Sequence, residues 1–248
     1  MCYKNRMKNT VYHNILYPLL NRLDYIRLSP KTILTVGWYW EEASENLQKR
    51  YPLATIQYCG ELTALNAQPN YSVDLIIAYF PVEWVSSFSE IVPLFEKLNQ
   101  RLCDDGLLLF VDLGPDTFQE LRKSFSAVDS FSHVFPFLDM HHMGDWLQGL
   151  HFAEPVVDRE EMIVTYDDPN LFFNDLQELH FSHRDVTRRK SVMTPRQWKK
   201  MVTQYEHFKT ENYFPVTVEI IFGHGWKVKL NEKNKDEVII PLSEIRRK

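Results

Sequence analysis

The sequence predicts an α/β protein whose core is a parallel sheet flanked by helices. Short runs of apolar and β-branched residues alternate with longer helical segments, which is typical of strands joined by right-handed crossovers. Two of these runs, 72–80 and 107–113, are almost entirely apolar, as expected of strands that are buried on both faces. The 248 residues are compatible with a single α/β unit with appendages.

The individual elements are predicted from apolar spacing and from the residues that end helices and strands. A first helix is expected over 11–28, ended by Pro30. Strands are then expected at 31–38, 54–60, 72–80 and 107–113, with helices at 41–50 and 86–103 between them. Further helices are expected at 115–125, 139–150, 171–179 and 195–208. The segment 154–166 is expected to form one or two strands, and a strand at 216–228 is expected to break at Gly223 and Gly225.

Composition and charge exclude several classes of function. With 28 Lys and Arg residues against 33 Asp and Glu, the net charge of −5 does not indicate a nucleic-acid-binding protein. No run approaches the roughly 18–20 apolar residues that a membrane span requires, and the N-terminus lacks the features of a secretory signal. Cys2, Cys59 and Cys103 match no zinc or disulfide spacing, so we expect no metal site and a reducing, cytoplasmic location.

The carboxyl ends of the predicted strands are the expected ligand-binding region, because parallel α/β sheets bind ligands there. The sequence places Gly37, Gly60, Glu61, Tyr79 and Gly114 at or directly after these ends. Three large residues, Trp38, Tyr39 and Trp40, follow Gly37. Stacking on an aromatic or apolar ligand and filling the core are both open interpretations of these three side chains.

The segment 114–168 carries a family resemblance. It begins GPDTFQELRKSF, contains SHVFPFLDMHH and ends IVTYDD. This segment resembles the second half of the BioC family, the malonyl-acyl-carrier-protein O-methyltransferases of biotin synthesis. The likeness continues through the pair Arg188 and Arg189 and the motif VEIIFGHGWK at 218–227, and covers roughly residues 72–227.

The resemblance implies a fold, a cofactor and a reaction. The implied fold is a reduced Rossmann-like core of the class I methyltransferases, completed by a C-terminal α+β lid. On this interpretation residues 1–130 form a truncated core and 131–248 form the lid and acceptor side, as one structural unit. The implied cofactor is S-adenosylmethionine, and the implied reaction transfers one methyl group to the free carboxylate of a malonyl thioester on acyl carrier protein.

The first half departs from the family pattern on the cofactor side. The family has an acidic residue and three alternating glycines after the first strand, whereas TVGWYWEE (35–42) retains only Gly37. Gly60 stands where the family has the acid that holds the ribose hydroxyls, and Glu61 follows one residue late. Ten residues separate Glu61 from Ser72, too few for the family's additional helix and strand. We therefore expect both elements to be missing and the sheet to be narrower.

Two hypotheses for function remain open on these residues. The protein is either an enzyme of the BioC type or a catalytically inactive relative that has lost its donor site and acts as a binding or scaffold protein. On the first hypothesis, Gly37, Glu61 and Tyr79 are the candidate cofactor-binding residues. The alternatives are that Gly37 only ends a strand in a turn, that Glu61 is a solvated acid in a loop, and that Tyr79 only packs in the core. The sequence identifies no catalytic residue.

The resemblance also implies substrate-binding candidates, namely His133, Arg188, Arg189, His224 and Trp226. The arginine that usually follows the histidine in the family is absent after His133, where Phe135 and Pro136 stand instead. His224 is a candidate to hydrogen-bond the acceptor carboxylate, and a buried histidine bonded to backbone is the alternative.

Residues 184–200 form a basic run in an acidic chain. Seven basic side chains lie there, opposed only by Asp185: Arg184, Arg188, Arg189, Lys190, Arg196, Lys199 and Lys200. Acyl carrier proteins are strongly acidic, so this run is a predicted carrier-docking surface. A solvated basic surface without a partner is the alternative.

Overall fold

The computed structural model describes residues 12–37, 41–80, 85, 87–178 and 188–229. Its centre is a six-stranded sheet in the order β2-β1-β3-β4-β6-β5. The strands are β1 (Thr32–Gly37), β2 (Thr55–Cys59), β3 (Val73–Tyr79), β4 (Leu102–Leu113), β5 (Phe152–Tyr166) and β6 (Phe214–Lys227). The first four strands are parallel, whereas β6 runs antiparallel to both β4 and β5. The predicted α/β class is confirmed, with a mixed sheet.

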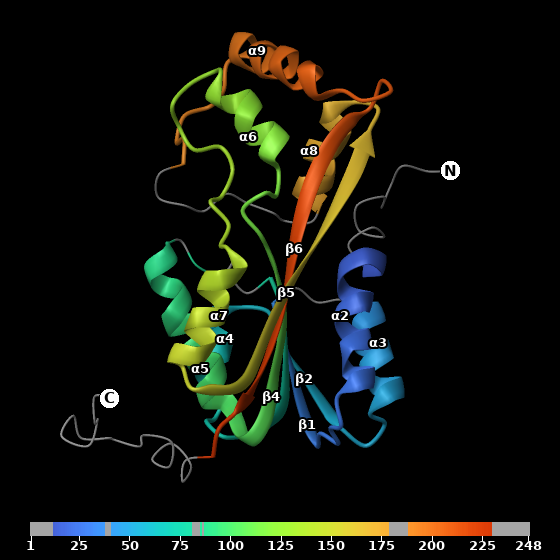
Figure 1. Cartoon of the computed structure of the whole chain (residues 1–248), viewed down its shortest axis with the longest axis vertical. Helices are drawn as coiled ribbons and strands as arrows, with labels where there is room; N and C mark the ends of the chain where they lie inside the picture. The colour runs from blue at the N-terminus through green and yellow to red at the C-terminus, as the bar shows by residue number, and fades with distance from the viewer. Residues whose placement is uncertain (1–11, 38–40, 81–84, 86, 179–187, 230–248) are drawn as a thin grey trace, which may run out of the picture.

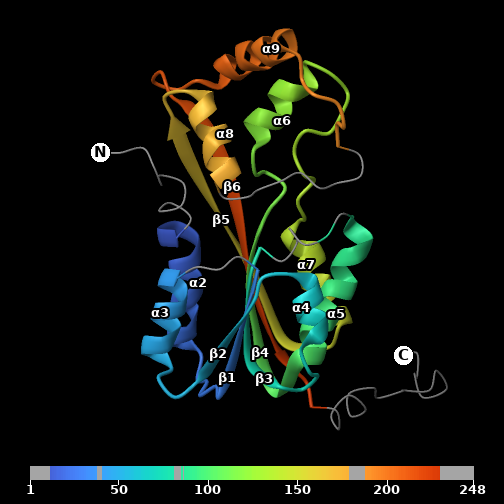
Figure 2. The same cartoon turned by 180° about the vertical axis from the view of Figure 1, so that it is seen from behind.

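Two helical layers cover the lower part of the sheet (Figure 1). On one face lie α2 (Tyr17–Asn21) and α3 (Glu41–Arg50), and on the other lie α4 (Leu62–Ala67), α5 (Ile91–Arg101) and α7 (Met140–Gly149). Figure 2 shows the same two layers from behind. The described residues also form the short helical segments η1 (Tyr12–Leu16) and η2 (Arg22–Tyr25) on either side of α2, η4 (Phe88–Glu90) before α5, and η5 (Glu206–Phe208) directly after α9.

The core lies on both faces of the sheet. Successive side chains of a strand point to opposite faces. Leu107, Leu109 and Val111 of β4 therefore pack with the α2 leucines on one face, and Leu108 and Phe110 pack with α5 and α7 on the other. This two-sided burial is the reason why the run 107–113 is almost wholly apolar.

The antiparallel strands β5 and β6 extend beyond the parallel strands into an upper lobe (Figure 1). Residues 214–219 of β6 pair with β5 but not with β4. Around this extension lie α6 (Gln119–Ser126), α8 (Pro169–Glu178) and α9 (Pro195–Tyr205). Part of 1–130 thus lies in the lobe, as α6, and part of 131–248 packs on the sheet, as α7. The division at residue 130 stays a prediction.

Two expectations about single elements are wrong. The first helical region ends at Tyr25, well before Pro30, because the chain is already extended at Ile26. The strand at 216–228 is not broken, since β6 runs continuously through Gly223 and Gly225. A Cβ at Gly223 would lie 2.9 Å from one carbon of the Phe110 ring and closer to two others. These glycines therefore make room for aromatic rings on neighbouring strands.

The short connection between β2 and β3 contains a helix that was not expected. Along the chain, the described residues 60–72 between β2 and β3 form no strand, but they do form the six-residue helix α4, so the expectation that the helix is missing is wrong. Ten residues hold one short helix but not a helix and a strand. The buried guanidinium of Arg101 donates to the carbonyl oxygens of Leu65 (3.2 Å) and Asn66 (3.4 Å), which stabilises the last turn of α4.

Candidate functional site

The carboxyl ends of the parallel strands meet at the junction between the sheet and the upper lobe (Figure 1). In the ladder, Gly37 at the end of β1 pairs with Tyr79 at the end of β3, and Tyr79 pairs with Val111 of β4. The three strands therefore end at nearly one level. Ligands of parallel α/β sheets bind at this edge, and we call it the carboxyl edge.

Gly37 occupies a position that only glycine can fill. Its φ is +101°, and an added Cβ would lie 3.0 Å from the Tyr79 carbonyl carbon and closer still to the carbonyl oxygen. The backbone conformation and the close approach to Tyr79 therefore require a glycine here even without a cofactor, which agrees with the interpretation of Gly37 as a turn glycine. Its role towards a cofactor stays a prediction, and Trp38, Tyr39 and Trp40 lie outside the described residues.

Glu61 lies beside Gly37 at the same edge. It directly precedes α4, with an extended backbone and no side-chain capping bond. Its carbonyl oxygen accepts from the Cys59 thiol (3.3 Å) and from the Leu65 amide (3.1 Å). Its side chain is exposed. Tyr79 differs, because its side chain is buried in the core behind the edge.

This edge is where the sequence predicts the ribose end of a nucleoside cofactor. An acidic side chain after the second strand accepts hydrogen bonds from ribose hydroxyls in related dinucleotide-binding folds. The exposed Glu61 carboxylate provides such an acceptor, one residue beyond Gly60. Gly37, Glu61 and Tyr79 are thus brought to adjacent strand ends, as the sequence predicts, and their individual roles stay predictions.

The turn after β4 is anchored to β6 by a residue that sequence reasoning missed. The buried Glu219 receives hydrogen bonds from the amides of Gly114 (2.9 Å) and Asp116 (2.8 Å). The signal that could have identified Glu219 is its position as the single charged residue in the mostly apolar run VTVEIIF. Buried charges in strands require partners, so such a residue indicates a specific contact.

His133 and Arg189 meet at one carboxylate, that of Asp129. His133 Nε2 lies 2.9 Å from Asp129 Oδ1, and its ring stacks on Phe125 with centroids 4.1 Å apart. Arg189 Nη1 donates to Asp129 Oδ2 at 2.6 Å. Burial raises the pKa of Asp129, but its hydrogen bonds with His133 and with the Phe131 amide hold the pKa below its usual value.

Arg189 has further partners in the chain. It donates to Gln197 Oε1 and to Ser191 Oγ, both at 3.0 Å. Gln197 belongs with Thr194 to the capping box that begins α9. Arg189 therefore connects Asp129 to the start of α9. Arg188, by contrast, is exposed, and its backbone forms an isolated parallel β-bridge with Ser132. The substrate-binding roles of all three basic candidates stay predictions.

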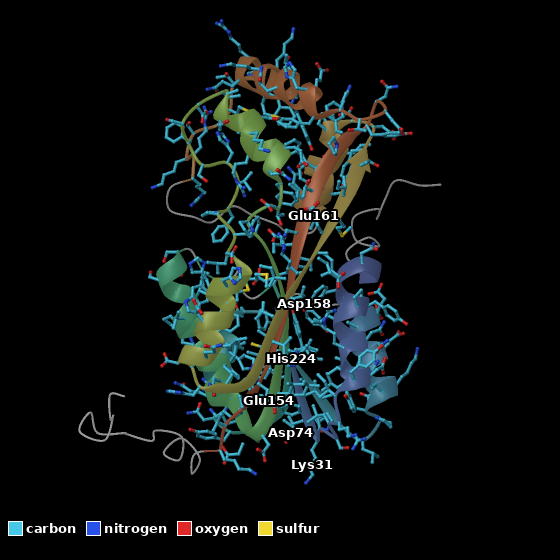
Figure 3. The ribbon with its side chains drawn as sticks, viewed as in Figure 1. Lys31, Asp74, Glu154, Asp158, Glu161 and His224 are labelled. Carbon is cyan, nitrogen blue, oxygen red and sulfur yellow. The ribbon has the colours of Figure 1, made fainter. Side chains whose placement is uncertain are left out.

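His224 and Trp226 lie away from the carboxyl edge. They pair with Leu109 and Leu107, whereas the edge is at Val111. Figure 3 shows His224 beside β5, between Asp158 and Glu154. Burial lowers the pKa of His224, and Asp158 and Glu154 oppose this shift. The structure does not bring these two residues together with Gly37 and Glu61, and their substrate roles stay predictions.

Four exposed cations lie on and just before α9: Lys190, Arg196, Lys199 and Lys200. We call them the α9 basic surface. Across the ranges that the structure describes, no carboxylate lies within ion-pair distance of these four residues. Val192, beside them in sequence, is 91% exposed. Arg184 and Asp185 fall outside the described residues.

No group of three or more His, Cys, Asp or Glu side chains in the part of the chain that the structure describes could hold a metal ion. Among the helices described, none is both long enough and apolar enough to cross a membrane.

Comparison of structures assigns the fold. The YcgJ protein of Bacillus subtilis matches with a TM-score of 0.51, at 12% identity over 86% of this chain and 99% of that chain. A candidate methyltransferase of Bacillus halodurans C-125 matches with a TM-score of 0.50, at 12% identity and the same coverage. The fold is therefore the Rossmann-like fold of the class I methyltransferases, as predicted.

Comparison of sequences is more specific, although no family model matches the chain. Malonyl-[acyl-carrier protein] O-methyltransferase 1 of Coxiella burnetii is 36% identical over 250 residues, covering 93% of this chain and 86% of the relative. The corresponding protein of Gallionella capsiferriformans is 30% identical and covers 84% and 81%. The chain belongs to the malonyl-acyl-carrier-protein O-methyltransferase family, which confirms the resemblance.

The inactive-relative hypothesis is not favoured. The similarity to the Coxiella burnetii protein spans 93% of the chain, so it includes the first half as well as the second. The departures at 35–42 and after β2 therefore occur within a chain whose two halves both match the family.

Proposed function

We propose that this protein transfers a methyl group from S-adenosylmethionine to the free carboxylate of a malonyl thioester on acyl carrier protein, in biotin synthesis. The single observation that carries this proposal is the 36% identity, over 93% of the chain, to a protein named for that activity. The carboxyl edge supports it, because Gly37 and Glu61 lie there on neighbouring strand ends.

In this proposal the cofactor is held at the carboxyl edge. Glu61 accepts hydrogen bonds from the ribose hydroxyls, and Gly37 lets the chain turn tightly at the end of β1. Tyr79 supports this turn from the buried side, through the backbone that Gly37 approaches. When bound, the cofactor supplies an electrophilic methyl group on a sulfonium sulfur.

The acceptor needs little acid–base assistance. A carboxyl group with a pKa of about 4 is already ionised at neutral pH, so no side chain has to remove a proton from it. The task of the protein is to align the acceptor oxygen with the methyl carbon and to exclude water, and such alignment lowers the barrier substantially. Within the proposal, His133 and Arg189 contribute indirectly, because both bind Asp129 and so fix the chain before α9. Arg188, His224 and Trp226 remain candidates for direct contact with the acceptor.

The α9 basic surface is the proposed docking site for the carrier protein. Its cations are exposed, and complementary charge with an acidic carrier would accelerate and orient association. The exposed Val192 offers an apolar contact among these charges. We expect the reaction to take place in the cytoplasm, in keeping with the free thiols of Cys59 and Cys103.

Two measurements test the enzymatic proposal. Purified protein mixed with malonyl carrier protein and S-adenosylmethionine should yield carrier protein heavier by one methylene group in intact mass spectrometry. In thermal unfolding, the cofactor at 100 times its Kd should stabilise the folded state by about 2.7 kcal/mol. Absence of both product and stabilisation at millimolar cofactor would reject the enzyme and favour the scaffold hypothesis.

The docking surface is tested by reversing charges that have no partner in the described fold. The double variant Lys199→Glu and Lys200→Glu should weaken carrier binding at low salt by about tenfold, mostly through slower association. The double variant Lys31→Glu and Lys49→Glu is the matched control, since it makes the same total charge change at two exposed positions outside the α9 basic surface. Arg189→Glu is unsuitable because it would also break the pair with Asp129. Equal carrier affinity in the double variant and the control would contradict docking on α9.

A further inference from the structure

The turn at 114–117, directly after β4, is held by one residue of β6, Glu219. The Gly114 amide donates to the Glu219 carbonyl oxygen at 2.9 Å, and the Asp116 amide donates to Glu219 Oε2 at 2.8 Å. The Thr117 hydroxyl donates to the same carbonyl oxygen at 3.0 Å and accepts from the Glu219 amide at 3.1 Å. Glu219 therefore contacts three of the four residues of the turn.

The carboxylate of Glu219 is buried and fully engaged. Glu219 is 3% exposed, and burying a carboxylate is costly unless its oxygens receive hydrogen bonds. One oxygen is satisfied by Asp116, and the other accepts from Arg159 Nη1 at 3.1 Å. The hydrogen bond to Glu219 raises the pKa of Arg159, so this guanidinium remains charged beside it.

Gly114 leaves the space that the Glu219 side chain occupies. A Cβ at position 114 would lie 2.7 Å from Glu219 Cγ and closer to the carboxyl group itself. Any larger residue at 114 would displace the carboxylate from its hydrogen bonds. The contact thus depends on both residues, which lie 105 positions apart in the chain.

This contact lies at the carboxyl edge. Leu113, the last residue of β4, pairs with Ile220, so Glu219 lies one position beyond the end of the β4–β6 ladder. In the proposed function the cofactor is held at this edge, so a shift of the turn would change the chain beside it. We propose that Glu219 is a positioning residue for methyl transfer, which acts by holding the turn at 114–117 in place. This inference depends on the proposed function.

A purely structural role is the competing explanation, and Asp74 provides a matched control. Its carboxylate also accepts two backbone amides, those of Lys31 (2.8 Å) and Thr32 (2.9 Å), but at the opposite, amino end of the sheet. Figure 3 shows Asp74 and Lys31 together at the lower end of the sheet. Asp74→Ala therefore removes a comparable carboxylate far from the carboxyl edge.

The experiment compares kcat and KM of the full-length variants with malonyl carrier protein as acceptor. For Glu219→Ala we expect kcat to fall by about 100-fold, the scale of a misplacement of about 1 Å, while KM for S-adenosylmethionine stays within about threefold. Glu219→Gln should recover much of this loss, because an amide oxygen can still accept from Asp116. Asp74→Ala should lower the melting temperature but leave kcat of the folded protein unchanged.

A second variant covers the case in which Glu219→Ala does not fold. Gly114→Ala displaces the carboxylate without removing it, and should also lower kcat with little change in KM for the cofactor. If kcat in the folded Glu219 and Gly114 variants equals that of Asp74→Ala while the wild type is active, the positioning role is wrong and the proposed function stands. If the wild type itself transfers no methyl group, the proposed function fails, and the positioning role fails with it.

Discussion

The substitution Gly37→Ala tests the geometry of the carboxyl edge most directly. At φ +101° an L-residue is strained, and a strained backbone conformation costs about 1–3 kcal/mol. The added methyl group would also press on the Tyr79 peptide, whose carbonyl carbon would be only 3.0 Å away. Overpacking of this kind costs about a further 1–3 kcal/mol.

We therefore expect Gly37→Ala to lower the free energy of unfolding by about 2–6 kcal/mol, which for a chain of this size lowers Tm by about 4 °C or more. Thermal unfolding followed by circular dichroism measures this change. Gly144→Ala in α7 is the matched control, because a Cβ there meets no atom within 4 Å. It should stabilise the protein by about 0.5–1 kcal/mol. A Gly37→Ala protein whose Tm lies within about 1 °C of the wild type would refute the argument.

Two further predictions concern packing and pH. Gly223→Ala should destabilise the protein by about 1–3 kcal/mol, because the methyl group would overlap the Phe110 ring; adding Phe110→Leu should restore part of this loss in a double-mutant cycle, and strictly additive effects would contradict the contact. The folded pKa of Asp129 lies below its unfolded value, so its stabilisation is present above pH ~4 and is lost as the pH falls from there through the folded pKa. Asp129→Asn should abolish this part of the pH dependence in chemical unfolding, and an unchanged pH profile would argue against the cluster with His133 and Arg189.

Local patterns were sufficient for most of the secondary structure. The helix predicted at 41–50 matches α3, and the run predicted at 72–80 contains β3. Both depend on neighbouring residues in the chain: acids in the first turn and bases in the last turn of α3, and an unbroken apolar run for a strand buried on both faces. The prediction failed at Gly223 and Gly225, because a glycine that accommodates a ring of a neighbouring strand has the same local pattern as a glycine that ends a strand.

The candidate site was only partly predictable. The rule that parallel strands bind ligands at their carboxyl ends depends only on strand order and direction. It therefore placed Gly37 and Glu61 at one edge of the sheet from the sequence alone. By contrast, the register of β6 puts His224 two residues below that edge, although its motif is strongly family-like. A register is set by pairing with other strands, so a motif alone does not reveal it.

The sequence by itself determined the fold class and the family and predicted the edge of the sheet for ligand binding, because these follow from periodicity, motif order and strand direction. Only the tertiary structure decided that Arg189 and His133 share Asp129, and that Glu219 holds the turn beside Gly114. These contacts join residues up to 105 positions apart, and the separation along the chain carries no signal of closeness in space. Such pairs form only when the fold brings distant segments together.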